Sequence, residues 1–236
     1  MVPKQITIAF LITLFVNLSA CQRLRPAPED TTWFFSSDCQ APCWNNLVPG
    51  ETLESEVEAI LLHTDSVSPD SIIGSDGGRK HYDRFFEFRI SETTILGIIG
   101  IMDGHVADLR FIRYENNLSA GSLGINLGDV IDGTGEPDYL VRAGNWVPAE
   151  FIGEGFDTFV YLINSSIGYA LIYDEDKLPE VERGYVREDV EIDEIIFFFP
   201  EDFDMLMEMG FLNLWITNEN DFIDWNGFGE YPGVYP

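Results

Sequence analysis

The sequence predicts an α+β fold made of two tandem units, each a short helix packed on an antiparallel meander. Helical apolar spacing occurs twice, in residues 52–63 and in residues 126–134, and strand-like runs follow each time. The links between those runs are short, and short links join antiparallel neighbours. We therefore expect the first α+β unit over residues 38–120 and the second over residues 121–210.

The first helix is expected to begin after Pro49-Gly50. Thr52 is a candidate N-cap, and acidic residues follow in the first turn, where the helix dipole favours negative charge. The residues at the spacing of one apolar helical face are Leu53, Val57, Ile60 and Leu61. Pro69 cannot continue the helix, so we expect it to end near His63.

Three strand-like runs complete the first unit: residues 82–90, 94–101 and 106–114. The second run is nearly all apolar or β-branched, as is usual in strands. Asp103-Gly104, between the second and third runs, is a strong signal for a tight hairpin. These runs therefore predict an antiparallel meander.

The second unit repeats this order. Asn126 is the candidate N-cap of its helix, and Pro137 stops that helix. The expected strands are residues 157–163, 167–173 and 190–199. The acidic residues 174–189 are expected to form a long loop. A short helix near residues 205–209 follows, and residues 211–236 form an aromatic-rich C-terminal tail whose structure the sequence does not predict.

The excess of acidic residues disfavours two classes of partner, nucleic acids and anionic lipid surfaces. The chain has 13 Lys and Arg against 41 Asp and Glu, a net charge of −28. Nucleic-acid binding is disfavoured because it depends on cations that neutralise phosphates. Lying flat on anionic lipid is disfavoured for the same reason. A solvated surface is the simplest interpretation, with divalent-cation binding or salt adaptation as alternatives.

The N-terminal residues have the order of an export signal. Lys4 precedes an apolar run over residues 6–16, and the small residues Ser19 and Ala20 precede Cys21. The run is shorter than the ~20 residues that span a bilayer. Leu18-Ser19-Ala20-Cys21 resembles the lipobox of bacterial lipoproteins, in which cleavage occurs just before a lipid-bearing Cys. An ordinary secretory signal and a retained helix are the alternatives.

The lipobox resemblance implies a location and an anchor. Residues 1–20 would be the signal peptide, and Cys21 would be the lipidated N-terminus with fatty-acyl chains such as palmitate. More than one acyl chain gives stable anchoring. The protein would then be extracytoplasmic, on a cell membrane or an outer membrane. Residues 21–37 are charged and Pro-rich and are expected to be a tether, with order beginning near Trp33 or at Cys39.

Cys39 and Cys43 are the other two cysteines. Outside the cytoplasm such residues can pair, so we expect a local disulfide, with free thiols as the alternative. A C-x3-C spacing without a nearby His is a poor metal site.

The two units also resemble each other. Residues 106–112 and 192–198 are similar strands, although two ordinary α+β units can share turn residues for local reasons. A helix opened by Gly, then Gly-x-Pro, then a meander resembles the small outer-membrane lipoproteins of the SmpA/OmlA type, and a tandem pair is similar to the β-lactamase-inhibitor-protein fold. The matching positions are Gly50, Glu51, Val57, Pro69, Gly128, Asp129, Val130, Gly135 and Pro137. The resemblance implies a non-enzymatic binding or envelope-assembly protein, and it transfers no binding residues.

No catalytic motif is found, and no cofactor is expected. The three His residues are scattered without ligand spacing, and carboxylates are too numerous for a glycosidase pair to be inferred. Asp174, Glu175 and Asp176 are weak metal candidates, because the rest of a Ca²⁺ loop is missing. The tail aromatics could stack on sugars or close the core.

The sequence therefore favours a membrane-anchored extracytoplasmic lipoprotein that binds an envelope protein and does not catalyse a reaction. The membrane would be reached through the N-terminal lipid, and no nucleic acid is involved. A carbohydrate- or Ca²⁺-binding module is the alternative, and a hydrolase with a carboxylate site is a third option.

Overall fold

The computed structural model describes residues 32–35, 39–77, 82–115, 118–119, 121–147, 155–208 and 222–231. They belong to one compact unit, Thr31–Pro236. Within these residues, no helix has both the length and the apolar character needed to cross a membrane.

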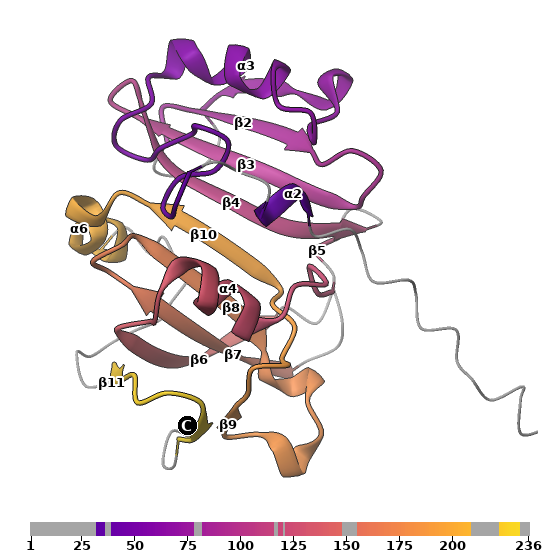
Figure 1. Ribbon diagram of the computed structural model, residues 1–236, viewed down its shortest axis with the longest axis vertical. Coiled ribbons are helices and arrows are strands. Elements are labelled where there is room, and N and C mark those ends of the chain that lie inside the picture. Colours follow the sequence, from indigo (N-terminus) through magenta and orange to yellow (C-terminus); the bar gives the residue numbers. More distant parts are fainter. Residues whose placement is uncertain are drawn as a thin grey trace, which may run out of the picture. The chain divides into compact units, whose positions relative to one another are not determined.

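A ten-stranded antiparallel sheet dominates the fold (Figure 1). Its strands are β1 (Ile73–Asp76), β2 (Arg84–Arg89), β3 (Ile95–Met102), β4 (His105–Glu115), β5 (Leu118–Ser119), β6 (Tyr139–Val147), β7 (Gly155–Asn164), β8 (Tyr169–Asp174), β10 (Glu194–Phe198) and β11 (Ile223–Asp224). The order across the sheet is β1-β2-β3-β4-β10-β8-β7-β6-β11, and β5 pairs with β4 off this path. A separate two-stranded ribbon pairs β9 (Tyr185–Val186) with β12 (Gly229–Glu230).

The predicted α+β class is wrong, because the fold is mostly β and one sheet runs through both expected units. All five residues of β10 pair with residues 108–112 of β4, so the two meanders share hydrogen bonds. The helices are short: α2 (Thr32–Phe35), α3 (Glu54–Leu62), α4 (Leu127–Thr134) and α6 (Phe203–Glu208). Single 3-10 turns are η1 (Pro69–Ser71), η2 (Glu175–Lys177), η3 (Glu180–Glu182) and η4 (Pro200–Asp202).

The strand pair β4–β10 has local two-fold symmetry. The similar segments 106–112 and 192–198 lie side by side in opposite directions, with Arg110 opposite Ile196. Two steps away, Asp108 faces Phe198 and Ile112 faces Glu194. Residues at matching positions of the two segments therefore lie equally far from the Arg110–Ile196 pair at the centre.

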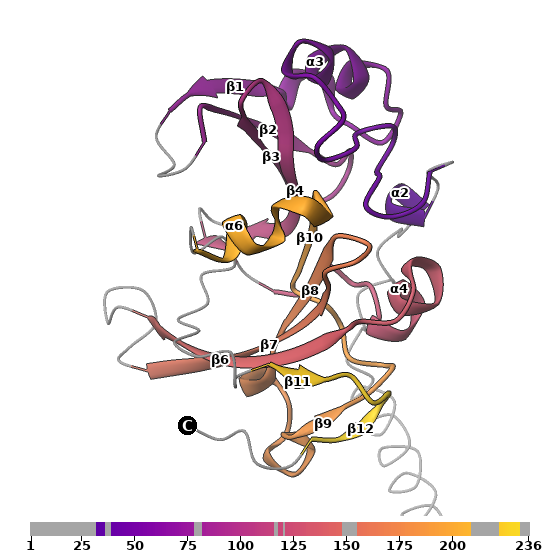
Figure 2. The ribbon, with the colours of Figure 1, turned by 90° about the vertical axis from the view of Figure 1, so that its left-hand side faces the viewer.

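Both faces of the sheet are covered around β10, as Figure 2 shows with α4 and α6 on opposite sides of β8 and β10. Ile195 and Phe197 join the core that includes α3 and α4. Ile196 and Phe198 join a second core, against which Phe203 of α6 packs. Successive side chains of a strand point to opposite faces. The unbroken apolar run of β10 is thus explained by burial on both sides.

The structure confirms the hairpin predicted at Asp103-Gly104, whereas the predicted N-cap of the first helix is wrong. Asp103 and Gly104 both have positive φ, 49° and 77°, as the tight turn between β3 and β4 requires. Helix α3 begins at Glu54 with Leu53 as its N-cap, not Thr52. The Thr52 hydroxyl instead accepts a 2.8 Å hydrogen bond from Val48 N–H and closes the preceding turn.

Candidate functional site

The proposed lipid attachment point, Cys21, lies outside the described residues, as does most of the expected tether. The compact unit begins within that stretch, at Thr31. Trp33 and Phe34 of α2 are buried, and both contact the ring of Phe111. Helix α2, which begins eleven residues after Cys21, is therefore already packed into the core.

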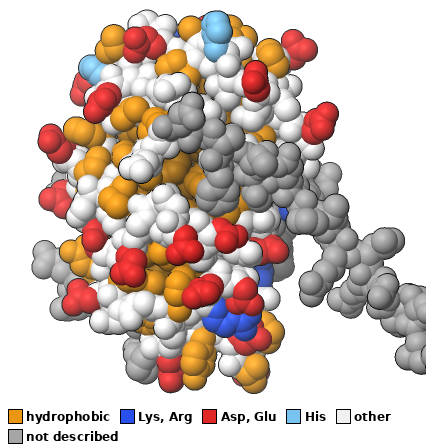
Figure 3. Space-filling view, in the orientation of Figure 1, with side chains coloured by type: hydrophobic (Ala, Val, Ile, Leu, Met, Phe, Trp, Pro, Cys, Tyr) orange, Lys and Arg blue, Asp and Glu red, His pale blue; other side chains and the backbone are white. Residues whose placement is uncertain are grey.

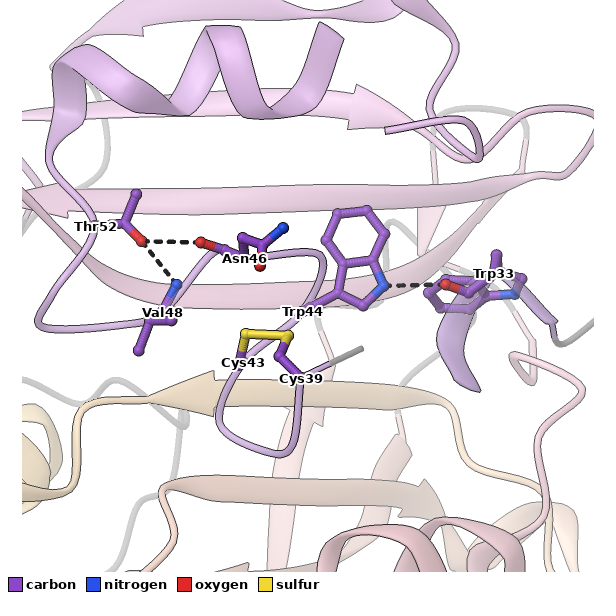
Figure 4. The surroundings of a disulfide bond; sticks show 7 residues. All are labelled: Trp33, Cys39, Cys43, Trp44, Asn46, Val48 and Thr52. Carbon is purple, nitrogen blue, oxygen red and sulfur yellow. Dashed lines mark hydrogen bonds between the residues drawn. A yellow bond between two sulfur atoms is a disulfide. The ribbon is translucent and has the colours of Figure 1, made fainter. Parts of the chain in front are cut away.

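Cys39 and Cys43 form a disulfide with an S–S distance of 2.09 Å (Figure 4). The chain then makes a tight hairpin, because Trp44 and Leu47 exchange backbone hydrogen bonds of 3.0 and 2.8 Å. The two residues between them have positive φ, Asn45 at 48° and Asn46 at 68°. This is the backbone that a two-residue turn of the Asn-Gly type demands, and Asn tolerates it.

Trp44 fixes the disulfide loop to the core. Its indole N–H donates a 3.1 Å hydrogen bond to the carbonyl of Trp33 (Figure 4). Its ring lies 5.5 Å from Phe88 and 4.9 Å from Phe111, centroid to centroid. Gly50 closes the segment: it has φ of 82°, and an added Cβ would lie 2.4 Å from the ring of Phe199. The loop is therefore held by packing as well as by the disulfide.

A hollow of about 220 Å³ opens beside the disulfide. Its lining is Phe34, Cys39, Gln40, Ala41, Cys43, Trp44, Gly133, Thr134 and Phe197. No ionisable side chain belongs to this lining, and the Thr134 hydroxyl already donates to the carbonyl of Val130 at 2.7 Å. The hollow offers apolar contact and a disulfide, but no acid or base.

Removing the disulfide should have a modest effect on stability. The loop spans a sequence separation of only 4, so closing it removes little entropy from the unfolded chain. We expect Cys39→Ser/Cys43→Ser to lower the free energy of unfolding by about 2 kcal/mol, measured by urea denaturation. Reduction of the unmodified chain should give the same loss, and a much larger loss would show that the disulfide holds Trp44 in place.

The three carboxylates considered as metal ligands each contact other groups of this same chain. The Glu175 side chain is buried, 3.2 Å from Arg142, and it accepts a 2.6 Å hydrogen bond from Gly184 N–H. Asp176 accepts from Thr158 N–H at 2.7 Å and lies 3.1 Å from Arg183. Asp174 accepts from Asp176 N–H and lies 3.7 Å from Lys177. In the described part of the chain, no group of three or more His, Cys, Asp or Glu could hold a metal ion.

Sequence reasoning missed the importance of Arg142, a lone cation in the apolar start of β6. It is buried beside Glu175 and donates a 3.0 Å hydrogen bond to the carbonyl of Tyr231. The nearby Tyr173 is also buried, and burial together with the charge of Glu175 raises the pKa of its hydroxyl. Arg142 thus joins β6, the loop after β8 and the C-terminal segment.

A second buried polar cluster lies at the β4–β10 pair. The Tyr82 hydroxyl donates to the carboxylate of Asp108, which is fully buried. Arg110 lies 3.6 Å from Asp108 and 3.6 Å from Glu194. Burial, reinforced by Asp108, raises the pKa of Tyr82. Burial opposes the charge of Arg110, but Asp108 and Glu194 raise its pKa above the ordinary value, so the cation and the neutral phenol persist at neutral pH.

The two described histidines lie in different elements, His63 at the C-terminal end of α3 and His105 at the start of β4. His63 Nδ1 is 2.6 Å from the carbonyl of Ala59, and His105 Nδ1 is 3.0 Å from the carbonyl of Asp103. His81 lies outside the described residues. The histidines do not form a shared site among the residues that the structure describes.

The ribbon β9–β12 carries an exposed aromatic surface. Tyr185 and Phe228 are 41% and 38% exposed, and Glu230 is exposed as well. Phe228 and Glu230 also line a hollow of about 350 Å³ made by the chain from Ile223 to Tyr231. Figure 3 shows that acidic side chains outnumber basic ones on the face in view.

Comparison with protein-family models, with curated proteins and with solved structures found no match to this chain.

Proposed function

We propose that this protein is a lipoprotein held on the extracytoplasmic face of a bacterial membrane, where it binds an envelope protein without catalysing a reaction. The observation that carries the proposal is Leu18-Ser19-Ala20-Cys21 at the end of an apolar run too short to span a bilayer. Two or more acyl chains on Cys21 supply enough buried hydrocarbon for stable attachment.

The charge of the chain supports a body held away from the lipid surface. A net charge of −28 repels the anionic headgroups of a bacterial membrane, so the covalent lipid supplies the attachment. The residues from Cys21 to Asp30 precede the compact unit and are rich in Pro and charge, which favours an extended connection.

The state of the buried charged groups supports binding rather than catalysis. Glu175 is paired with Arg142, and Asp108 lies with Arg110 and Tyr82. Such paired clusters hold segments of the chain together, whereas a general acid or base must face a substrate. Exposed aromatic side chains, in contrast, are enriched where proteins meet.

The anchor is tested with Cys21→Ser. We expect the variant to lose incorporated radioactive palmitate and to leave the membrane fraction, either released or as an uncut precursor. The matched control is Cys39→Ser/Cys43→Ser, which removes the other two cysteines and should remain labelled and membrane-bound. Unchanged labelling and sedimentation of the Cys21→Ser protein would refute the proposal.

A further inference from the structure

We propose that Cys39 and Cys43 form a reversible thiol–disulfide exchange site, which accepts two electrons from an uncharged thiol that enters the hollow beside them. The feature that suggests this is a disulfide whose two cysteines are both partly exposed and both line that hollow. Exposed disulfides are the labile ones in thiol exchange, whereas disulfides that only stabilise a fold resist reduction. The inference goes beyond the proposed function and depends neither on the lipid anchor nor on a protein partner.

The hollow gives a small molecule access to the disulfide. Its volume of about 220 Å³ is far above the ~10–15 Å³ that one water molecule needs. The rings of Phe34 and Phe197 belong to its lining, are both buried and stack with 6.0 Å between their centroids. The packed core therefore holds this part of the hollow in place whether the disulfide is closed or open.

The two sulfur atoms stay close together after reduction, because other contacts hold the loop. The Cys43 N–H donates a 3.0 Å hydrogen bond to the carbonyl of Gln40, which closes the turn between the cysteines. The next residue, Trp44, is only 1% exposed and is fixed by its hydrogen bond to Trp33 (Figure 4). The Cα atoms of the two cysteines lie 5.6 Å apart, a separation that suits a disulfide, so this backbone favours re-oxidation.

Opening the disulfide leaves the chain folded. The sequence separation of 4 means that the bond restricts the unfolded chain little. The backbone hydrogen bonds between Trp44 and Leu47 and the close approach of Gly50 to Phe199 do not involve the sulfur atoms. The site can therefore change its oxidation state without unfolding of the body.

The exchange proceeds in two balanced steps. The thiolate of the incoming thiol attacks one sulfur atom of the disulfide, the S–S bond breaks, and a mixed disulfide forms. The other cysteine leaves as a thiolate and takes a proton from water. A second thiolate then attacks the small molecule's sulfur in the mixed disulfide and releases the remaining cysteine. In sum, two small thiols are oxidised to their disulfide, and Cys39 and Cys43 are reduced to thiols.

The hollow favours an uncharged thiol. Among the described residues that line it, no side chain carries a charge that could pair with a carboxylate or a sulfonate on the thiol. Placing such an anion beside apolar rings without a partner costs free energy. The net charge of −28 adds a long-range repulsion against anionic thiols.

The test is reduction of the full-length chain under native conditions, solubilised in detergent. The probes are mercaptoethanol and its anionic analogue mercaptoethanesulfonate at equal ionic strength, with maleimide quenching and mass spectrometry. With mercaptoethanol we expect a mixed disulfide at Cys39 or Cys43 and then two further maleimide labels, at a rate proportional to thiol concentration and with unchanged circular dichroism. The anionic analogue should react several-fold more slowly, and equal rates would overturn the preference for an uncharged thiol.

Three outcomes would overturn the exchange site itself. Reduction only in urea, or a rate that stops rising with thiol concentration, would show that the sulfur atoms are reached only through unfolding. Failure of the reduced chain to reform its disulfide with hydroxyethyl disulfide would overturn reversibility. The Cys39→Ser/Cys43→Ser chain is the control and should gain no adduct. These outcomes are independent of membrane attachment through Cys21, which fractionation measures separately.

Variants of α4 locate the path of the thiol. Gly133→Leu and Thr134→Leu each add bulk at a position that lines the hollow, so each should slow reduction by about tenfold. Asp132→Leu adds the same side chain at an exposed position of α4 outside the lining and should react like the unmodified chain. Reduction at the unmodified rate in both lining variants would overturn entry through the hollow.

Discussion

Replacing Arg142 with Met should lower the free energy of unfolding by about 3–5 kcal/mol. The substitution leaves Glu175, which is 3% exposed, as a buried charge without its cation 3.2 Å away. It also removes the hydrogen bond from Arg142 to the carbonyl of Tyr231. Breaking one partner of a buried pair is costly, because the remaining charge cannot return to water without unfolding the structure around it.

Urea denaturation followed by circular dichroism measures this loss. The double variant Arg142→Met/Glu175→Gln should recover much of it, because the amide oxygen of Gln can still accept from Gly184 N–H and no charge is left buried. Arg187→Met breaks an exposed pair and should leave the unfolding midpoint nearly unchanged. If Arg142→Met were as stable as Arg187→Met, the buried pair would not hold the C-terminal segment.

Replacing Asp108 with Ala should be nearly as damaging, by about 3 kcal/mol or more. Asp108 is fully buried, accepts from the Tyr82 hydroxyl and lies 3.6 Å from Arg110. Without it, the phenol loses its carboxylate acceptor, and the Arg110 guanidinium loses one of the two carboxylates that lie 3.6 Å away. The substitution also destabilises the β4–β10 strand pair, which joins the two meanders into one sheet.

Amide hydrogen exchange gives the sharpest measurement of that effect. In the Asp108→Ala chain, the amides of β4 and β10 should exchange faster than those of β7, which lies farther along the sheet. Glu58→Ala, an exposed carboxylate on α3, is the control and should change neither exchange nor stability. Loss of stability without faster exchange at β4 and β10 would contradict a role for Asp108 at this strand pair.

The local elements could be predicted from the sequence where one pattern dominated. The runs around β2, β3 and β4, joined by Asp103-Gly104, gave antiparallel strands because strand length and turn chemistry agreed. β6 was missed because Arg142, Gly144 and Asn145 interrupt its apolar residues. The reason for Arg142 lies in Glu175 and Tyr231, which are distant in the sequence.

The fold class could not be predicted because it depends on one long-range pairing. Nothing local in residues 106–112 or 192–198 says that they lie side by side, and that pairing makes one sheet of two meanders. The pairing of Tyr185 with Glu230 was hidden for the same reason, since it exists only through the β9–β12 register. The turn at Asn45 and Asn46 did leave a signal, because two adjacent Asn residues tolerate positive φ.

The central claim is that Cys21 carries the lipid that holds this protein on a membrane. Intact-mass spectrometry of the protein purified from bacterial membranes tests it most directly. We predict a chain that begins at Cys21 and carries the added mass of a diacylglycerol with its acyl chains. A chain that begins at any other residue, or one that begins at Cys21 without added lipid mass, would contradict the claim.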